Sequence, residues 1–232
     1  CTSPTIFSSY ATMGWETQAQ IGIAALTNLS LLPAIFYAYR RKQSFIFIIT
    51  LMSLITSIAY HTCDAWENPP PTDKDAYKVA PRLFGMNAGS WHRLDNIYAI
   101  LNVQSMFLFF ADFKATTTND TVRWLCLTIC LFFQELSPWN LLCTVIPILI
   151  AAFIMLTKYI FTQQLPNCDR ANLIMGSIVC LIGIVFFQRG LDEDSDYLRL
   201  NHSVWHAMAG LATYFWYRCK VEVETRTSAK IM

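Results

Sequence analysis

Long blocks of apolar residues, separated by short polar stretches, dominate the sequence. Because about 20 mostly apolar residues cross about 30 Å of hydrocarbon as an α-helix, each block predicts one membrane-spanning helix. Pro33 and Pro147 fall inside the first and fifth blocks and should kink them, since proline supplies no backbone N–H. The seven predicted spans cover residues 19–39, 44–62, 92–112, 121–136, 139–161, 171–188 and 200–218. The predicted fold class is therefore an all-α membrane protein, a bundle of seven transmembrane helices.

The polar ends of the chain define the predicted domain organisation. Residues 1–18 form an N-terminal segment, residues 19–218 the seven-helix transmembrane domain, and residues 219–232 a tail. Because the sequence begins with Cys1 rather than Met, we expect a processed or trimmed product, from which an upstream segment has been removed. A disulfide between Cys1 and Cys63 is one option, with both thiols free as the other.

The basic residues of the connections predict an orientation. Eleven of the 17 Lys and Arg residues lie on the side that carries the C-terminus, and six lie on the side of the N-terminus. By the positive-inside rule, the N-terminus is outside and the C-terminus is in the cytoplasm. The protein would then reside in the plasma membrane or a membrane of the secretory pathway.

Composition narrows the possible partners. Hydrophobic residues make up 54% of the chain and charged residues only 14%, which is typical of a protein whose solvent is a bilayer. The net charge of +1 and the lack of a basic run argue against nucleic acid, whose phosphates need clustered Lys and Arg. Membrane lipid is the expected partner.

Few ionisable or hydrogen-bonding side chains lie at the ends of the predicted spans, and each is a candidate site residue because burying it in a membrane is costly. Ser57 and His61 are four residues apart, as are His202 and His206, so each pair shares one face of its helix. The alternating topology brings both pairs and Asp95 to the same depth, near the extracytoplasmic face. Each residue alone could instead be an interfacial side chain.

Three imidazoles and an open fourth position are typical of catalytic zinc. We therefore predict that His61, His202 and His206 bind Zn²⁺, although imidazole also suits copper, iron and nickel. Such a site supports hydrolysis by a zinc-activated water, with Asp95 as proton acceptor and Ser57 as hydrogen-bond donor. His92 is expected to be interfacial, with proton transfer as an alternative, and Arg199 with the acidic stretch 192–196 to form a solvated rim.

Three motifs together resemble the CREST superfamily of seven-helix membrane proteins. Within it, the chain looks most like the transmembrane-protein-8 group, which contains a GPI-specific phospholipase A2 and the muscle fusion protein myomaker. The resemblance implies zinc binding by the three histidines and a catalytic pair of Asp95 and Ser57. The motifs are Ser57-Ile-Ala-Tyr-His61-Thr-Cys63-Asp64, Leu94-Asp95-Asn-Ile-Tyr98 and His202-Ser-Val-Trp-His206.

The expected function is that of a zinc-dependent intramembrane lipid hydrolase that cleaves an acyl ester in a GPI-type or other phospholipid. A ceramide amide is the second substrate class. A different class of function, a fusion factor or receptor with a structural zinc, is the alternative, and a transporter using the same polar residues is a third. The retained Asp95 favours the hydrolase.

Overall fold

The computed structural model describes residues 14–68, 82–192 and 196–220. Within these ranges the regular structure is helical, and extended pairing is limited to two isolated bridges, Leu83 with Met86 and Cys168 with Lys220. The helices are α2 (Trp15–Asn28), η2 (Leu29–Leu31), α3 (Leu32–Arg40), α4 (Ser44–Glu67), α5 (Ala88–Ala111), α6 (Thr116–Leu136), α7 (Leu141–Thr162), α8 (Arg170–Gly190), η4 (Tyr197–Arg199) and α9 (Leu200–Cys219).

The described residues form the predicted all-helical fold, and apolar helices of membrane-spanning length indicate an integral membrane protein. In the described ranges, five helical segments are long and apolar enough to cross a bilayer: Trp15–Arg40 (α2, η2 and α3), α4, α5, α7 and α8. The other two helices, α6 and α9, coincide in position with the predicted fourth and seventh spans but are not among these five.

Several helices extend beyond their predicted spans. The polar residues at their ends are helical, but hydropathy detects only the apolar part of each helix. Helix α4 continues to Glu67, α5 begins at Ala88 and α6 begins at Thr116. The start of α5 is fixed by Asn87, whose side-chain oxygen accepts a hydrogen bond from the Ser90 backbone N–H at 2.9 Å.

The two prolines have different effects. At the first, the 3₁₀ turn η2 interrupts the helix, and Pro33 occupies the first turn of α3, where a missing N–H is harmless. At the second, Pro147 lies inside α7, which remains one helix. Proline at this position leaves the Cys143 carbonyl without its usual helical donor.

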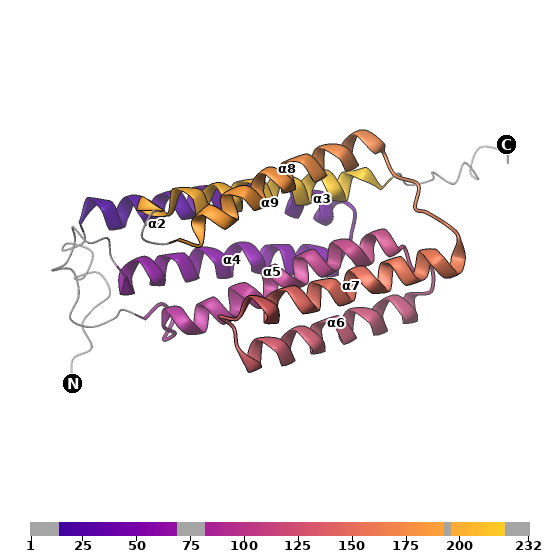
Figure 1. Ribbon diagram of the computed structural model, residues 1–232, viewed down its shortest axis with the longest axis horizontal. Helices are drawn as coiled ribbons and strands as arrows, with labels where there is room; N and C mark the ends of the chain where they lie inside the picture. Colours follow the sequence, from indigo (N-terminus) through magenta and orange to yellow (C-terminus); the bar gives the residue numbers. More distant parts are fainter. Residues whose placement is uncertain (1–13, 69–81, 193–195, 221–232) are drawn as a thin grey trace.

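Neighbouring helices run side by side in a bundle (Figure 1). Helix α8 packs along α9, α4 packs along α5, and α5 also contacts α6 and α7. Helices α2 and α3 lie against both α4 and α9, so they join the α8–α9 pair to the rest of the bundle. The beginning of α2 and the end of α9 lie at opposite ends of the bundle (Figure 1).

A stripe of small residues brings α8 close to α9. Gly176, Gly183 and Gly190 are the buried residues of α8 and are spaced seven apart. A Cβ atom at Gly176 would lie 2.7 Å from the Trp216 ring, and one at Gly190 would lie 2.8 Å from the His202 backbone nitrogen. Because glycine has no side chain, α8 and α9 can approach closely at these positions.

Candidate metal centre

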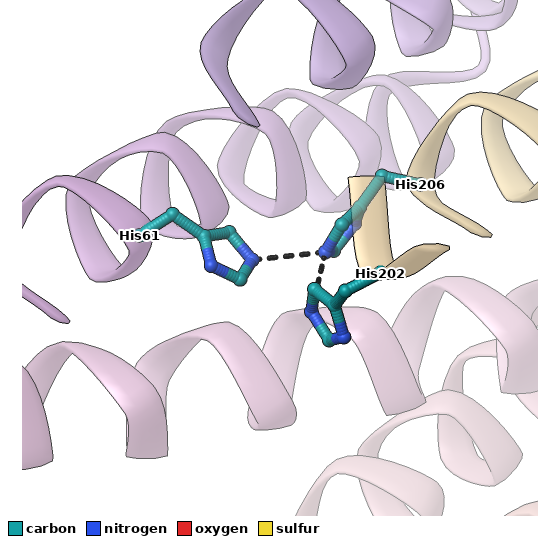
Figure 2. A group of neighbouring side chains, drawn as sticks. All are labelled: His61, His202 and His206. Atoms are coloured by element: carbon teal, nitrogen blue, oxygen red, sulfur yellow. Dashed lines mark hydrogen bonds between the residues drawn. The ribbon is translucent and has the colours of Figure 1, made fainter. Parts of the chain in front are cut away.

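Three histidine side chains from two helices point toward one another (Figure 2). His61 comes from α4, near its C-terminal end, and His202 and His206 come from the first two turns of α9. The Nε2 atom of His206 lies 2.9 Å from Nε2 of His61 and 3.1 Å from Nε2 of His202. Ligand atoms of all three residues lie within 4.8 Å of one another, as the predicted site requires.

The donor chemistry of these rings fits a metal ion. An sp² ring nitrogen has one in-plane position for a hydrogen or a lone pair, yet Nε2 of His206 faces two other nitrogens. A cation among the three lone pairs would satisfy all of them. Zn–N bonds of about 2.0–2.1 Å place neighbouring nitrogens of a tetrahedral site about 3.3 Å apart, close to the 2.9 and 3.1 Å observed. Imidazole by itself does not select among zinc, copper, iron and nickel.

Close packing fixes the backbone of α9 around its two ligands. The Ser30 hydroxyl donates a hydrogen bond to the His206 carbonyl oxygen at 3.1 Å. Gly210, one turn further along α9, allows this approach, because a Cβ there would lie 2.1 Å from the Ser30 hydroxyl oxygen. Gly190 of α8 likewise admits the backbone of His202. Contacts from η2 and α8 therefore hold the two imidazole-bearing turns in place.

A buried carboxylate caps the turn that carries His202. Asp196 is 3% exposed and accepts hydrogen bonds from the backbone N–H groups of Asn201 (2.7 Å) and His202 (3.0 Å). Leu198 and Arg199, between the cap and the helix, have φ angles of 57° and 55°, a conformation that is unfavourable for residues with a side chain. Capping by Asp196 offsets part of this cost.

An ion pair links the two ligand-bearing helices. The Arg199 guanidinium donates to the Asp64 carboxylate at 3.3 Å, and the side chains are 16% and 10% exposed. Asp64 lies three residues after His61, on the same face of α4. The predicted solvated rim is therefore wrong for Arg199 and Asp196, which are held by partners inside the fold, while residues 193–195 of that stretch lie outside the described ranges.

The predicted catalytic residues, Ser57 and Asp95, lie in α4 and α5, which pack against each other. Ser57 precedes His61 by one helical turn. Ser57 and Asp95 are both buried, and the Ser57 hydroxyl has no hydrogen-bond partner in the described structure. The register of the antiparallel helices α4 and α5, in which Ser53 donates a hydrogen bond to the Tyr98 carbonyl (2.8 Å), brings the two residues to the same level.

Asp95 is not part of the ligand cluster itself. Among the described residues, the group of three or more His, Cys, Asp or Glu side chains whose ligand atoms lie within 4.8 Å of one another consists of the three histidines. Because the helix register puts Asp95 level with Ser57, four residues before His61, the backbone of Asp95 lies about 6 Å along the axis of α4 from that of His61. A water molecule could span this gap, whereas direct ligation by Asp95 would require a different arrangement of α5.

His92 also lies in α5, three residues before Asp95 and so about one turn nearer the start of that helix. Its ring stacks on Trp139 with centroids 3.5 Å apart and meets the edge of Tyr60 at 4.9 Å. Tyr60 in turn lies 4.7 Å from the ring of His61. His92 is thus packed between aromatic rings beside the histidine cluster, and its interfacial position stays a prediction.

Sequence comparison assigns the chain to a family. The family described as "Protein of unknown function (DUF3522)" matches residues 16–207. The chain belongs to the DUF3522 family. No curated protein matches the chain. The region matched to DUF3522 begins in α2, ends just after His206 and includes the three histidines as well as Ser57 and Asp95.

The sequence of this DUF3522 protein predicts the three histidines that converge, but not the residues that hold them in place. The position of Asp64, one turn after His61 on the same helical face, could have indicated that its side chain lies near the histidines. Its partner Arg199 is 135 residues away, and spacing cannot connect the two. The choice between a Cys1–Cys63 disulfide and two free thiols falls partly outside the described residues, because Cys1 is not among them; Cys63 is fully buried.

Proposed function

We propose that this protein is a zinc-dependent intramembrane hydrolase that cleaves an acyl ester of a membrane phospholipid, with a GPI-type lipid as the favoured substrate. The observation that supports the proposal most is the convergence of three Nε2 atoms about one helical turn from the buried residues Ser57 and Asp95. The resemblance of the three motifs to the CREST superfamily supports the same reaction class. The observed fold provides the apolar environment that a lipid substrate needs.

Each residue has a distinct role in this proposal. His61, His202 and His206 hold the zinc ion, which when bound acts as a Lewis acid toward a carbonyl oxygen and activates a water molecule. Asp95 accepts the proton released when water attacks the acyl carbonyl, and later returns it to the leaving alcohol. Ser57 donates a hydrogen bond that orients the Asp95 carboxylate.

The proposal includes the topology of the bundle. All seven helical segments, α6 and α9 included, cross the membrane, with the N-terminus outside and the C-terminus in the cytoplasm. The excess of basic residues at the end of the bundle remote from His61 supports this orientation. The zinc site would then lie near the extracytoplasmic face of the plasma membrane or a secretory-pathway membrane.

Asp95→Asn tests the reaction. The purified full chain would be assayed for metal content by elemental analysis and for release of fatty acid from GPI-type lipid, phospholipid and ceramide. We expect the variant to keep one zinc per chain and to lose turnover by at least about 100-fold. Asp120→Asn, which changes the same group in an exposed turn of α6, is the matched control. Full activity of Asp95→Asn on every lipid cleaved by the unmodified protein would contradict the mechanism.

A second candidate is a membrane fusion factor or receptor in which zinc is purely structural. It is favoured by the position of the cluster, which joins α4 to α9, and by the distance of Asp95 from the ligand set. In this case His206→Ala would lose folding and surface expression, whereas Asp95→Asn would behave normally in a cell fusion or signalling assay. Fatty acid release that depends on Asp95 would exclude this candidate.

A further inference from the structure

Two adjoining cavities lie at the end of the bundle remote from the histidine cluster. The first, the apolar cavity, has a volume of about 600 Å³ and lies between α6 and α7, where it is lined mainly by apolar side chains such as Val122, Phe153 and Phe161. The second, the polar cavity, has a volume of about 360 Å³ and lies between the start of α4, the end of α5 and the start of α6. Asp112 and Phe113 line both cavities, so the two share a wall.

The cavities are separate from the metal centre. Ser44 lines the polar cavity, and His61 lies 17 residues further along the same helix. At 1.5 Å per residue, this separation is about 26 Å, close to the thickness of the hydrocarbon core. A ligand in the cavities would therefore lie at the opposite face of the membrane from the histidines.

Positive charge is concentrated around the two cavities. Lys42, Arg123 and Lys220 line the polar cavity, and Lys114 and Lys158 line the apolar one, whereas Asp112 is the carboxylate in either lining. Lys114 and Lys220 both donate hydrogen bonds to Asp112 and so share its negative charge. Burial alone would oppose ionisation, but the two lysines hold the pKa of Asp112 below its ordinary value.

The remaining cations leave an excess of positive charge. Arg123 is paired with Asp120 at 3.4 Å and lies over the Phe45 ring, 4.8 Å from its centroid. Lys42 forms no ion pair with a carboxylate of the described residues, and it is held in a turn with a φ of 54°. An anionic group in the cavity would supply the missing counter-charge.

Two features indicate that the anion belongs to a lipid. The side chains of Phe153 and Phe161 are 69% and 83% exposed on the outer side of α7, so the apolar cavity opens where hydrocarbon would surround the helix. In addition, the side-chain oxygen of Gln43, on the wall of the polar cavity, is buried without a hydrogen-bond partner in the described structure. A hydroxyl or ammonium group of a phospholipid headgroup could donate to it.

We propose that the two cavities bind one anionic phospholipid of the surrounding leaflet. Its phosphate lies between Lys42, Arg123 and Lys220 in the polar cavity, and one acyl chain passes Phe113 into the apolar cavity. Both volumes fall in or near the usual range for ligand sites. Basic pockets between transmembrane helices have the charge that recognises anionic headgroups.

Lipid titration of the purified full chain in detergent, followed by native mass spectrometry, tests the proposal. The probe is dioleoyl phosphatidylserine, and dioleoyl phosphatidylcholine serves as the zwitterionic reference. Removing two basic contacts in the double variant Lys42→Gln with Arg123→Gln should weaken phosphatidylserine binding about 30-fold. Arg218→Gln is the matched control, since Arg218 lies at the same end of the bundle but lines neither cavity.

The acyl-chain part of the proposal needs its own variant. Thr157→Trp places an indole in the apolar cavity and should weaken phosphatidylserine binding about tenfold, whereas Ile160→Trp, on the exposed face of α7, should not. Unchanged binding in the charge variant would overturn the proposal. Equal loss in Arg218→Gln would also overturn it, because it would indicate general surface attraction. Competition by millimolar inorganic phosphate would assign the site to a small anion instead of a lipid.

Discussion

The side-chain amide of Gln134, in α6, donates a hydrogen bond to the backbone carbonyl of Cys143, in α7, at 3.2 Å. In a regular helix this carbonyl would accept from the N–H group of residue 147, which is proline. Gln104 of α5 donates to the carbonyl of Pro147 itself at 2.9 Å. Both glutamines are almost completely buried. The proline has thus freed the carbonyl that Gln134 contacts, and its own carbonyl accepts a second hydrogen bond from another neighbouring helix.

Gln134→Leu should destabilise the protein by about 1–3 kcal/mol, because it leaves the Cys143 carbonyl without a donor in an apolar environment. Pro147→Ala restores a backbone N–H at the position that this carbonyl normally uses. The double variant should therefore lose less stability than the sum of the two single variants. Thermal unfolding of all four proteins in one detergent measures the coupling. Additive losses would contradict the account.

Gly190→Ala should weaken metal binding without removing a ligand. A Cβ at residue 190 would lie 2.8 Å from the His202 backbone nitrogen and 2.9 Å from its Cα atom, so the first turn of α9 must move. We expect metal affinity to fall about 10–100-fold, as it does when supporting contacts of a site are lost. Gly22→Ala is the matched control, since its Cβ would meet nothing within 4 Å. Metal titration with a competing chelator measures both, and equal affinities would contradict the prediction.

Asp64→Asn should be far more damaging than the removal of an exposed ion pair. The Asp64–Arg199 pair is mostly buried, and loss of Asp64 removes a counter-ion of the largely buried Arg199, at a cost of about 3 kcal/mol. Arg93→Gln breaks a pair with Glu135 whose side chains are 42% and 69% exposed, and should cost less than about 1 kcal/mol. Unfolding temperatures of the two variants provide the comparison. A similar small loss in both would show that Asp64 does not hold α9.

Asp112 should make a pH-dependent contribution to stability. Hydrogen bonds from Lys114 and Lys220 lower its pKa in the folded protein against the opposing effect of burial. The contribution is therefore complete above the unfolded pKa of about 3.9 and is lost as the pH falls through the lower folded value. Asp112→Asn removes it, and asparagine tolerates the φ of 50° found here. The stability gap between the two proteins should be constant from pH 7 to pH 5 and should shrink below about pH 4. A gap that grows on acidification would contradict the assignment.

The convergence of the three histidines was predictable from sequence because it follows mainly from helical geometry. His202 and His206 are one turn apart, and alternation of the helices brings His61 to their level. The all-helical membrane fold was predictable because long apolar blocks are visible in the sequence itself. Asp95 is buried in α5 but is not one of the clustered ligand side chains, so its catalytic role beside the imidazoles stays a prediction.

The contacts that hold the site could not be predicted in this way. Arg199 and Asp196 are charged residues in a polar stretch, which by composition resembles a solvated loop. Only the folded chain shows that one reaches Asp64 across the bundle and that the other caps α9. Similarly, a hydrophobicity profile treats Gln134 as an unfavourable residue in a span, because the profile contains no information about the carbonyl freed by Pro147.

The glycine stripe of α8 also limits how its sequence can vary over evolutionary time. Gly176, Gly183 and Gly190 each face a close neighbour on α9, whereas much of the rest of the helix is apolar and outward-facing. Exchanges among apolar residues should be nearly neutral on that outer surface, and any side chain at the three glycines should be rejected. In a saturation library of α8 selected for folded protein, the positions that tolerate no substitution should then recur every seven residues. Their positions would show which face of α8 packs against α9.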